Sequence, residues 1–195
     1  MANKKINLGL PSSEQIQDEL KRIKHKREYF KMLKGTIVSL LAVAATAVLI
    51  SMLFMPVLKV TGSSMEPTLS DGQLVLCLNN KNFHTGDVVA FYYNNKILLK
   101  RVIAVAGDVI SISEDGSVTV NNELIAEPYI TDKSKGKCDI EFPYQVPDNR
   151  IFVMGDHRST SVDSRSSVIG CISEEDIVGK VIFRIYPFNK FGSID

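Results

Sequence analysis

Residues 35–58 read GTIVSLLAVAATAVLISMLFMPVL, 24 residues without a charged side chain, between Lys34 and Lys59. As a helix rising ~1.5 Å per residue, this stretch extends about 36 Å, enough to cross a hydrocarbon core of ~30 Å. A buried core helix is disfavoured because the stretch has no polar face, and a chain of this size could hardly surround it. A cleaved secretory signal is disfavoured because 34 mostly polar residues precede a run longer than the ~7 to 15 apolar residues of such signals. The sequence therefore predicts a transmembrane helix over 35–58.

The charges before this span predict its orientation. Residues 1–34 carry nine Lys and Arg against four Asp and Glu, which leaves 14 against 18 for residues 35–195. Because Lys and Arg beside a span stay cytoplasmic, we expect a single-pass protein of the cell membrane with residues 1–34 inside and residues 59–195 outside. A capping-box pattern at Ser12 and Gln15, followed by apolar residues at helical intervals, predicts an amphipathic helix in the basic tail. This tail either lies on anionic headgroups or serves only to orient the span.

Composition excludes several classes of function. The formal net charge is only +1, which excludes a nucleic-acid binder working through a strongly basic surface. The three cysteines, Cys77, Cys138 and Cys171, share no C-x-x-C spacing, and the chain has only three histidines. We therefore expect no metal cofactor and interpret the cysteines as small buried apolar residues.

Beyond Lys59 the helical periodicity gives way to short runs rich in Val, Ile, Phe and Tyr, separated by turn residues. Residues 59–195 are therefore expected to form a mainly β domain. Tight turns are expected at residues 94–95 and 114–117. Residues 131–149, with two prolines and scattered charges, are interpreted as a surface excursion. The expected strands are Leu74–Leu78, Asp87–Tyr93, Ile97–Ala106, Val109–Ser113, Val118–Val120, Arg150–Met154 and Ile177–Tyr186.

A candidate nucleophile, Ser64, lies in the stretch TGSSMEPTL at residues 61–69. Most serines in such turns only satisfy backbone groups, and a nucleophile also needs a base. His157 directly follows Asp156, a spacing that seldom allows a carboxylate to orient an imidazole. Strand alternation instead turns Lys100 to the apolar face that it shares with Leu98 and Val102, and turns Arg101 to the opposite face. Burial there would lower the pKa of Lys100 from ~10.4. From the residues alone, a Ser-Lys pair, a Ser-His-Asp triad and a purely structural Lys100 all remain open.

Three blocks of sequence narrow these alternatives: GSSMEPTL at 62–69, LKRVIAVAGDVI at 99–110 and MGDHRSTSVDSR at 154–165. In order, spacing and preceding anchor they resemble the sequence boxes of the bacterial type I signal peptidases, over residues 36–186. The resemblance implies a signal-peptidase-like β-sheet catalytic domain. It also implies a Ser-Lys endopeptidase, without metal or organic cofactor, that removes N-terminal signal peptides from exported preproteins.

The resemblance also implies roles for single residues. Ser64 corresponds to the family nucleophile, Lys100 to its general base and Ser161 to the hydroxyl that orients the lysine amine. The supporting residues correspond to an ion pair and the loop packed beside it: Asp163 and Arg165, with Gly155, Asp156 and Arg158. Gly62 stands where some members have a Ser that helps bind the oxyanion, as in the shorter Gram-positive branch, so a replacement donor or a water is expected.

The position of the nucleophile near the membrane predicts the class of substrate. Five residues separate Leu58 from Ser64, and at ~3.3 Å each they place Ser64 at most about 20 Å from the apolar span. A protease held there meets preproteins leaving the membrane, whose signal peptides end in small residues. We therefore expect preproteins and the lipid bilayer as partners, and the protein export machinery only indirectly. Met65, Leu98 and Leu99 are candidate substrate-pocket walls, with core packing as their alternative role.

Two rival functions belong to other classes. An inactive signal-peptidase-like chaperone could assemble surface proteins or pili, but the presence of both Ser64 and Lys100 argues against it. An anchored β-domain that only binds an extracellular ligand would show no change on Ser64→Ala.

Overall fold

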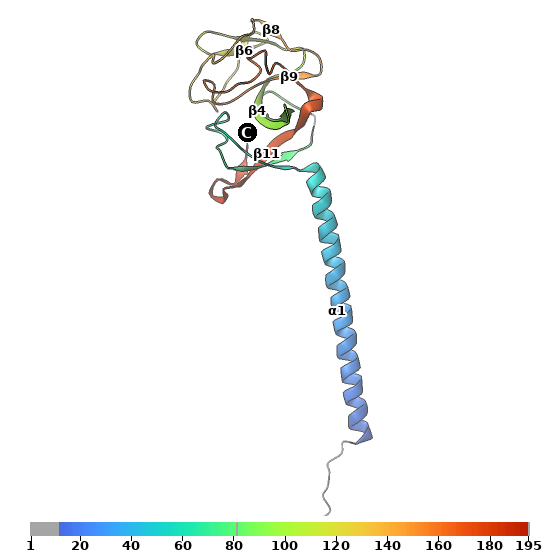
Figure 1. Ribbon diagram of the computed structural model, residues 1–195. Helices are drawn as coiled ribbons and strands as arrows, with labels where there is room; N and C mark the ends of the chain where they lie inside the picture. The colour runs from blue at the N-terminus through green and yellow to red at the C-terminus, as the bar shows by residue number, and fades with distance from the viewer. Residues whose placement is uncertain (1–11, 81, 195) are drawn as a thin grey trace, which may run out of the picture. The chain divides into compact units, whose positions relative to one another are not determined.

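The chain forms one long helix, α1, followed by a β-rich unit (Figure 1). This computed structural model describes residues 12–80 and 82–194. It divides into a helical unit up to Ile50 and a second unit from Ser51 onward. The predicted class, mainly β with one N-terminal apolar helix, is confirmed.

Helix α1, Ser13–Phe54, begins at the predicted capping box. The Ser12 N–H donates to Gln15 Oε1 (2.9 Å) and the Gln15 N–H donates to Ser12 Oγ (3.3 Å). The helix is long and apolar enough to cross a membrane, with a mean hydropathy of 1.9 in its most apolar part. It ends at Phe54, four residues before the predicted limit at Leu58, because Pro56 disfavours a helical conformation in the residue before it. The predicted helix therefore ends four residues earlier than expected.

An eight-stranded antiparallel sheet forms the centre of the second unit. Its order is β1-β2-β11-β3-β4-β9-β10, with β12 paired to β11. The strands are β1 Val57–Lys59, β2 Leu74–Leu78, β3 Val88–Tyr93, β4 Lys96–Ala104, β9 Arg150–Met154, β10 Ile172–Ser173, β11 Ile177–Tyr186 and β12 Gly192–Ser193.

A second, four-stranded sheet has the order β7-β6-β5-β8. Its strands are β5 Val109–Ile112, β6 Val118–Val120, β7 Glu123–Leu124 and β8 Tyr144–Gln145, and the 3-10 turns η1 Glu174–Asp176 and η2 Phe188–Lys190 flank β11. All seven predicted strands are present with ends within two residues of the expected ones. The five strands that were not predicted span only two or three residues each, too few for a side-chain pattern to be recognised.

Both predicted turns join strand partners. Asn94 and Asn95 have φ of 46° and 59° and connect β3 to β4, as a tight hairpin requires. Between β5 and β6 the Ser113 N–H donates to the Ser117 carbonyl (2.9 Å). The first of these hairpins carries Lys100 near the middle of its second strand.

The interpretation of residues 131–149 as a surface excursion is wrong for its second half. Tyr144–Gln145 pairs with β5, and Val146 is buried. Ile140, Phe142 and Tyr144 pack against the same hydrophobic cluster. Residues 140, 142, 144 and 146 are thus alternately apolar, a period-two signal that the two prolines and the charges obscured.

The cysteines are free thiols, with Cys77 and Cys171 buried and Cys138 only half-buried. Burial raises the pKa of the Cys77 thiol to about 12. The expected burial is therefore confirmed for two of the three.

Candidate active site

Ser64 lies in the turn between β1 and β2, and neighbouring residues fix this turn. Gly62 has φ +86°, a conformation that favours glycine, and its N–H donates to Asp71 Oδ1 (2.8 Å). Met65 and Leu69 are buried, and the Leu69 N–H donates to the Met65 carbonyl (2.8 Å). The hydroxyl of Ser64 is thus presented from a turn that is anchored on both sides.

Lys100 lies on β4, opposite Val89 of β3, with only 3% of its surface exposed. Its Nζ is 2.6 Å from Ser64 Oγ. The pKa of Lys100 is lowered to about 8, mainly because the amine is buried; the charges of Asp163 and Asp156 oppose this shift, and the charge of Arg165 favours it. The structure therefore brings together a hydroxyl and an amine with an unusually low pKa, at hydrogen-bonding distance.

The loop after β9 packs directly on the Ser64 turn. The His157 N–H donates to the Ser64 carbonyl (3.1 Å). A Cβ added to Gly155 would collide with Ser161 Oγ and would lie 2.5 Å from the Ser64 carbonyl oxygen. Only glycine therefore allows the loop and the turn to approach this closely.

Ser161 is buried in this loop, beside Gly155. Its Oγ has no hydrogen-bond partner among residues 12–80 and 82–194. The expected contact with the Lys100 amine is thus not formed here, and the orienting role of Ser161 stays a prediction.

Asp163 and Arg165 form the ion pair that the resemblance implies. Arg165 Nε and Nη2 donate to the two carboxylate oxygens of Asp163 (2.8 and 2.9 Å), and both side chains are fully buried. Burial alone would raise the pKa of Asp163, but the hydrogen bond and charge of Arg165 hold it below its ordinary value. The Gly155 N–H also donates to Asp163 (2.9 Å), so the pair fixes the loop that touches Ser64.

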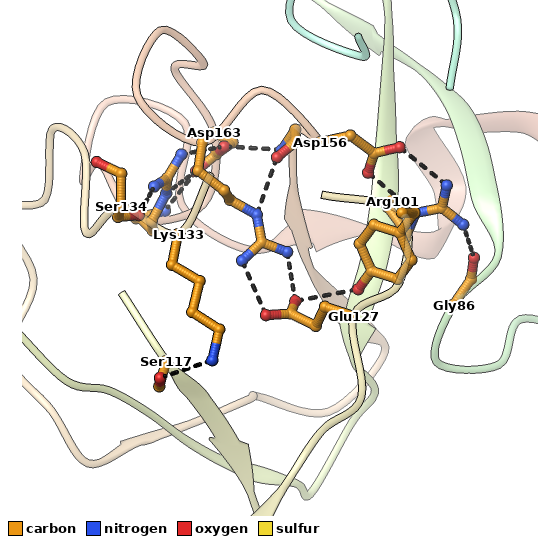
Figure 2. Close-up of polar contacts among 12 residues, drawn as sticks. Gly86, Arg101, Ser117, Glu127, Lys133, Ser134, Asp156 and Asp163 are labelled. Carbon is orange, nitrogen blue, oxygen red and sulfur yellow. Dashed lines mark hydrogen bonds and ion pairs between the residues drawn. The ribbon is translucent and has the colours of Figure 1, made fainter. Parts of the chain in front are cut away.

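Asp156 belongs to a different ion pair, with Arg101 (Figure 2). Arg101 Nε and Nη2 donate to the carboxylate (2.9 Å each), and Nη1 donates to the Gly86 carbonyl (2.7 Å). The guanidinium also lies 3.9 Å from the centre of the Tyr129 ring. Alternation correctly predicted that Arg101 faces away from Lys100, but the sequence did not identify its partners.

Arg158 links the loop after β9 to the segment that contains Glu127. Its Nε donates to the Gly155 carbonyl (3.1 Å), and its Nη1 and Nη2 donate to Glu127. The Tyr129 hydroxyl donates to the same carboxylate (3.0 Å). Glu127 and Tyr129 were not among the predicted site residues. The only available signal was that a buried arginine requires a carboxylate or an aromatic partner.

The triad geometry is absent from the described residues. Asp156 is engaged by Arg101 and accepts a short hydrogen bond from Thr68. His157 Nδ1 is buried without a hydrogen-bond partner among these residues. Its imidazole is therefore not oriented by a carboxylate, as a triad would require.

A cavity of about 370 Å³ opens beside Ser64 and Lys100. The three predicted wall residues, Met65, Leu98 and Leu99, all line it. Among the described residues, no group of three or more His, Cys, Asp or Glu side chains is arranged to hold a metal ion.

Comparisons with known proteins identify the family of this chain. Residues 32–186 match the family model described as "Signal peptidase, peptidase S26". The chain is 32% identical over 190 residues to signal peptidase I of Bacillus licheniformis, covering 91% of this chain and 99% of that protein. It is 32% identical over 166 residues to signal peptidase I U of Bacillus subtilis strain 168 (79% and 88%). It is 37% identical over 153 residues to signal peptidase IB of Staphylococcus aureus strain COL (68% and 78%). The chain therefore belongs to the signal peptidase family, peptidase S26.

Proposed function

We propose that this signal peptidase removes N-terminal signal peptides from exported preproteins through Ser64 as nucleophile and Lys100 as general base. The observation that carries the proposal is the 2.6 Å contact between Ser64 Oγ and a buried Lys100 Nζ. A lysine acts as a base only when neutral, and burial, which lowers the pKa of Lys100 to about 8, makes the neutral amine accessible near physiological pH.

The reaction then proceeds through an ester on Ser64. As Ser64 Oγ bonds to the carbonyl carbon of the scissile peptide, its proton passes to Lys100 Nζ. The carbon–nitrogen bond breaks, and Nζ returns that proton to the leaving amine. A water next attacks the ester and gives a proton to Nζ. The ester bond breaks, Ser64 Oγ takes that proton from Nζ, and the signal peptide leaves as a carboxylic acid that gives its own proton to the solvent.

The oxyanion needs donors that do not move during the reaction. The Ser64 N–H is not bonded to an acceptor among the described residues, so it is free to serve as one donor. With glycine at position 62, a water is the second donor in this proposal. Met65, Leu98 and Leu99 form the walls that receive small side chains before the scissile bond.

The remaining predicted residues support the pair rather than react. In this proposal Ser161 orients the Lys100 amine when substrate is bound, since apo hydrogen bonds in catalytic sites often form only in the complex. Gly155, Asp156, Arg158, Asp163 and Arg165 hold the loop that contacts the Ser64 carbonyl.

The membrane arrangement follows from the charges and the apolar helix. We propose that the basic tail, residues 1–34, is cytoplasmic, that the apolar part of α1 crosses the cell membrane, and that the β-rich unit is extracytoplasmic. This arrangement places the catalytic unit on the side of the membrane where preproteins emerge. The protein export machinery is then only an indirect partner. No nucleic acid has a part in the function.

The deciding experiment incubates the full chain in detergent with a preprotein bearing an Ala-x-Ala site. We expect wild type and His157→Ala to release the mature protein, and Ser64→Ala and Lys100→Ala not to. Cleavage by Lys100→Ala together with an inactive His157→Ala would favour a triad. Surface-protein assembly that persists in cells carrying Ser64→Ala, without any processing defect, would favour the chaperone function.

A further inference from the structure

A second cavity, of about 460 Å³, shares Lys100 and Leu98 with the cavity beside Ser64. Its other walls include Tyr93 and Lys96 from the β3–β4 hairpin and Val162 and Val168 from the loop after β9. The Tyr93 hydroxyl donates to the Val168 carbonyl (2.7 Å), which ties the two walls together. Ser64 lines the first cavity, and the residues lining the second do not include it.

This arrangement offers one cavity for each of the two products of bond cleavage. After acylation the signal-peptide side remains bonded to Ser64 Oγ and therefore lies in the cavity that Ser64 lines. The leaving amine must come within reach of Lys100 Nζ, because that amine takes its proton from Lys100. The chain beyond the leaving amine then continues past Lys100, away from Ser64. The second cavity adjoins Lys100 and is not lined by Ser64, which makes it the candidate for this part of the chain.

The walls of the second cavity favour a particular chemistry. Val162 and Val168 supply apolar surface, and Lys96 adds an exposed ammonium group that forms no ion pair with any described residue. None of the described residues lining this cavity is acidic. A carboxylate on the entering chain would therefore meet a cation and no like charge, whereas a lysine there would be repelled.

We propose that this cavity binds the first residues after the scissile bond, and that Lys96 makes the enzyme favour substrates with acidic side chains there. The inference rests on the proposed Ser64–Lys100 function and extends it to the side of the substrate that becomes the mature protein.

The test uses the full chain in detergent with pairs of quenched peptides. Each pair has the same Ala-x-Ala sequence before the cut and carries Glu or Lys at the first two positions after it. We expect a Glu-to-Lys ratio of kcat/KM of about 3 to 10 in the wild type at low salt, falling as salt is added. Lys96→Glu should bring the ratio below one, and Val168→Arg, at a site 70% exposed, should raise it.

Lys59→Glu is the matched control, because Lys59 lines the first cavity. It should leave the ratio unchanged. An unchanged Glu-to-Lys ratio in both Lys96→Glu and Val168→Arg would show that the leaving chain does not bind in this cavity. A ratio that changes in Lys59→Glu instead would show the same. Such a result would leave the proposed function intact as long as cleavage still required Ser64. Cleavage that persists in Ser64→Ala would instead contradict the proposed function itself.

Discussion

The backbone N–H of His157 donates a hydrogen bond of 3.1 Å to the backbone carbonyl of Ser64. This bond joins the loop after β9 to the turn that carries the nucleophile, although the two are more than ninety residues apart in the sequence. The position of the Ser64 hydroxyl therefore depends on the conformation of a distant loop, and a Cβ on Gly155 would lie only 2.5 Å from the Ser64 carbonyl oxygen.

Gly155→Ala should disturb this contact directly. The new methyl group would press on Ser161 Oγ and on the Ser64 carbonyl, so we expect kcat/KM to fall and the free energy of unfolding to drop by about 1 to 3 kcal/mol. Gly192→Ala is the control, since a Cβ there meets nothing within 4 Å. Peptide cleavage and urea unfolding of both variants check the prediction, and equal behaviour of the two would contradict it.

The rate of cleavage should rise with pH. Because burial lowers the pKa of Lys100 to about 8 and only the neutral amine accepts the Ser64 proton, kcat/KM should increase about tenfold per pH unit below that value and level off above it. At pH 7 about a tenth of the enzyme is then in the reactive form. A profile that is flat between pH 6 and 9 would show that Lys100 is not the base.

Lys100→Met should inactivate the enzyme and stabilise its fold at neutral pH. A lysine whose pKa is lowered on folding costs stability below its folded pKa, about 8 here, and the cost disappears as the pH approaches the unfolded value of ~10.4. The gain at pH 7 is at most about 3 kcal/mol and should shrink by pH 10. Urea unfolding of the full chain in detergent at both pH values measures it. A Met variant less stable than wild type at pH 7 would refute this account of the amine.

Two buried serines of the same loop should behave in opposite ways. Ser164 Oγ accepts a hydrogen bond from the Val153 N–H (3.0 Å), so Ser164→Ala should cost about 1 to 3 kcal/mol of stability. Ser161 Oγ has no partner among the described residues, so Ser161→Ala should leave stability almost unchanged. If Ser161 orients the amine in the complex, that variant should instead lower kcat and shift the pH profile. An unaltered kcat and profile would remove the positioning role.

The Asp156–Arg101 pair should be strongly coupled in stability measurements. Asp156→Ala leaves a buried guanidinium without its carboxylate, which we expect to cost about 3 to 5 kcal/mol. Because the double variant Arg101→Met/Asp156→Ala removes both charges, its cost should be well below the sum of the single variants. Additive losses in a double-mutant cycle would show that the two side chains stabilise the fold independently.

Much of the fold was predictable because its central elements carry strong local patterns. The apolar span and the capping box at Ser12 predicted α1, and runs of β-branched and aromatic residues predicted seven strands. Alternation along β4 also placed Lys100 and Arg101 on opposite faces. The short strands β1, β7, β8, β10 and β12 offered only two or three residues each, and the limit of the span was missed because Pro56 was read as part of it.

The site was only partly predictable for a related reason. The residues of the three sequence blocks were identified, but their partners were not, since a carboxylate such as Glu127 looks like any surface acid until the fold buries it against Arg158. In the same way Asp156 was grouped with the nearby Asp163–Arg165 pair, whereas sheet pairing of β4 with β9 brings it to Arg101. Such long-range pairings depend on topology, which local patterns do not encode.

The neighbouring residues Lys100 and Arg101 on β4 have different roles, and this difference has a practical consequence. Arg101 is held by a carboxylate, a backbone carbonyl and an aromatic ring, whereas the Lys100 amine contacts Ser64. The low pKa of Lys100 comes mainly from burial, and Leu98, on the same face of the strand, lines both cavities that Lys100 lines. Substitutions at Leu98 should therefore shift the pH at which the enzyme works, while the contacts of Arg101 on the opposite face remain.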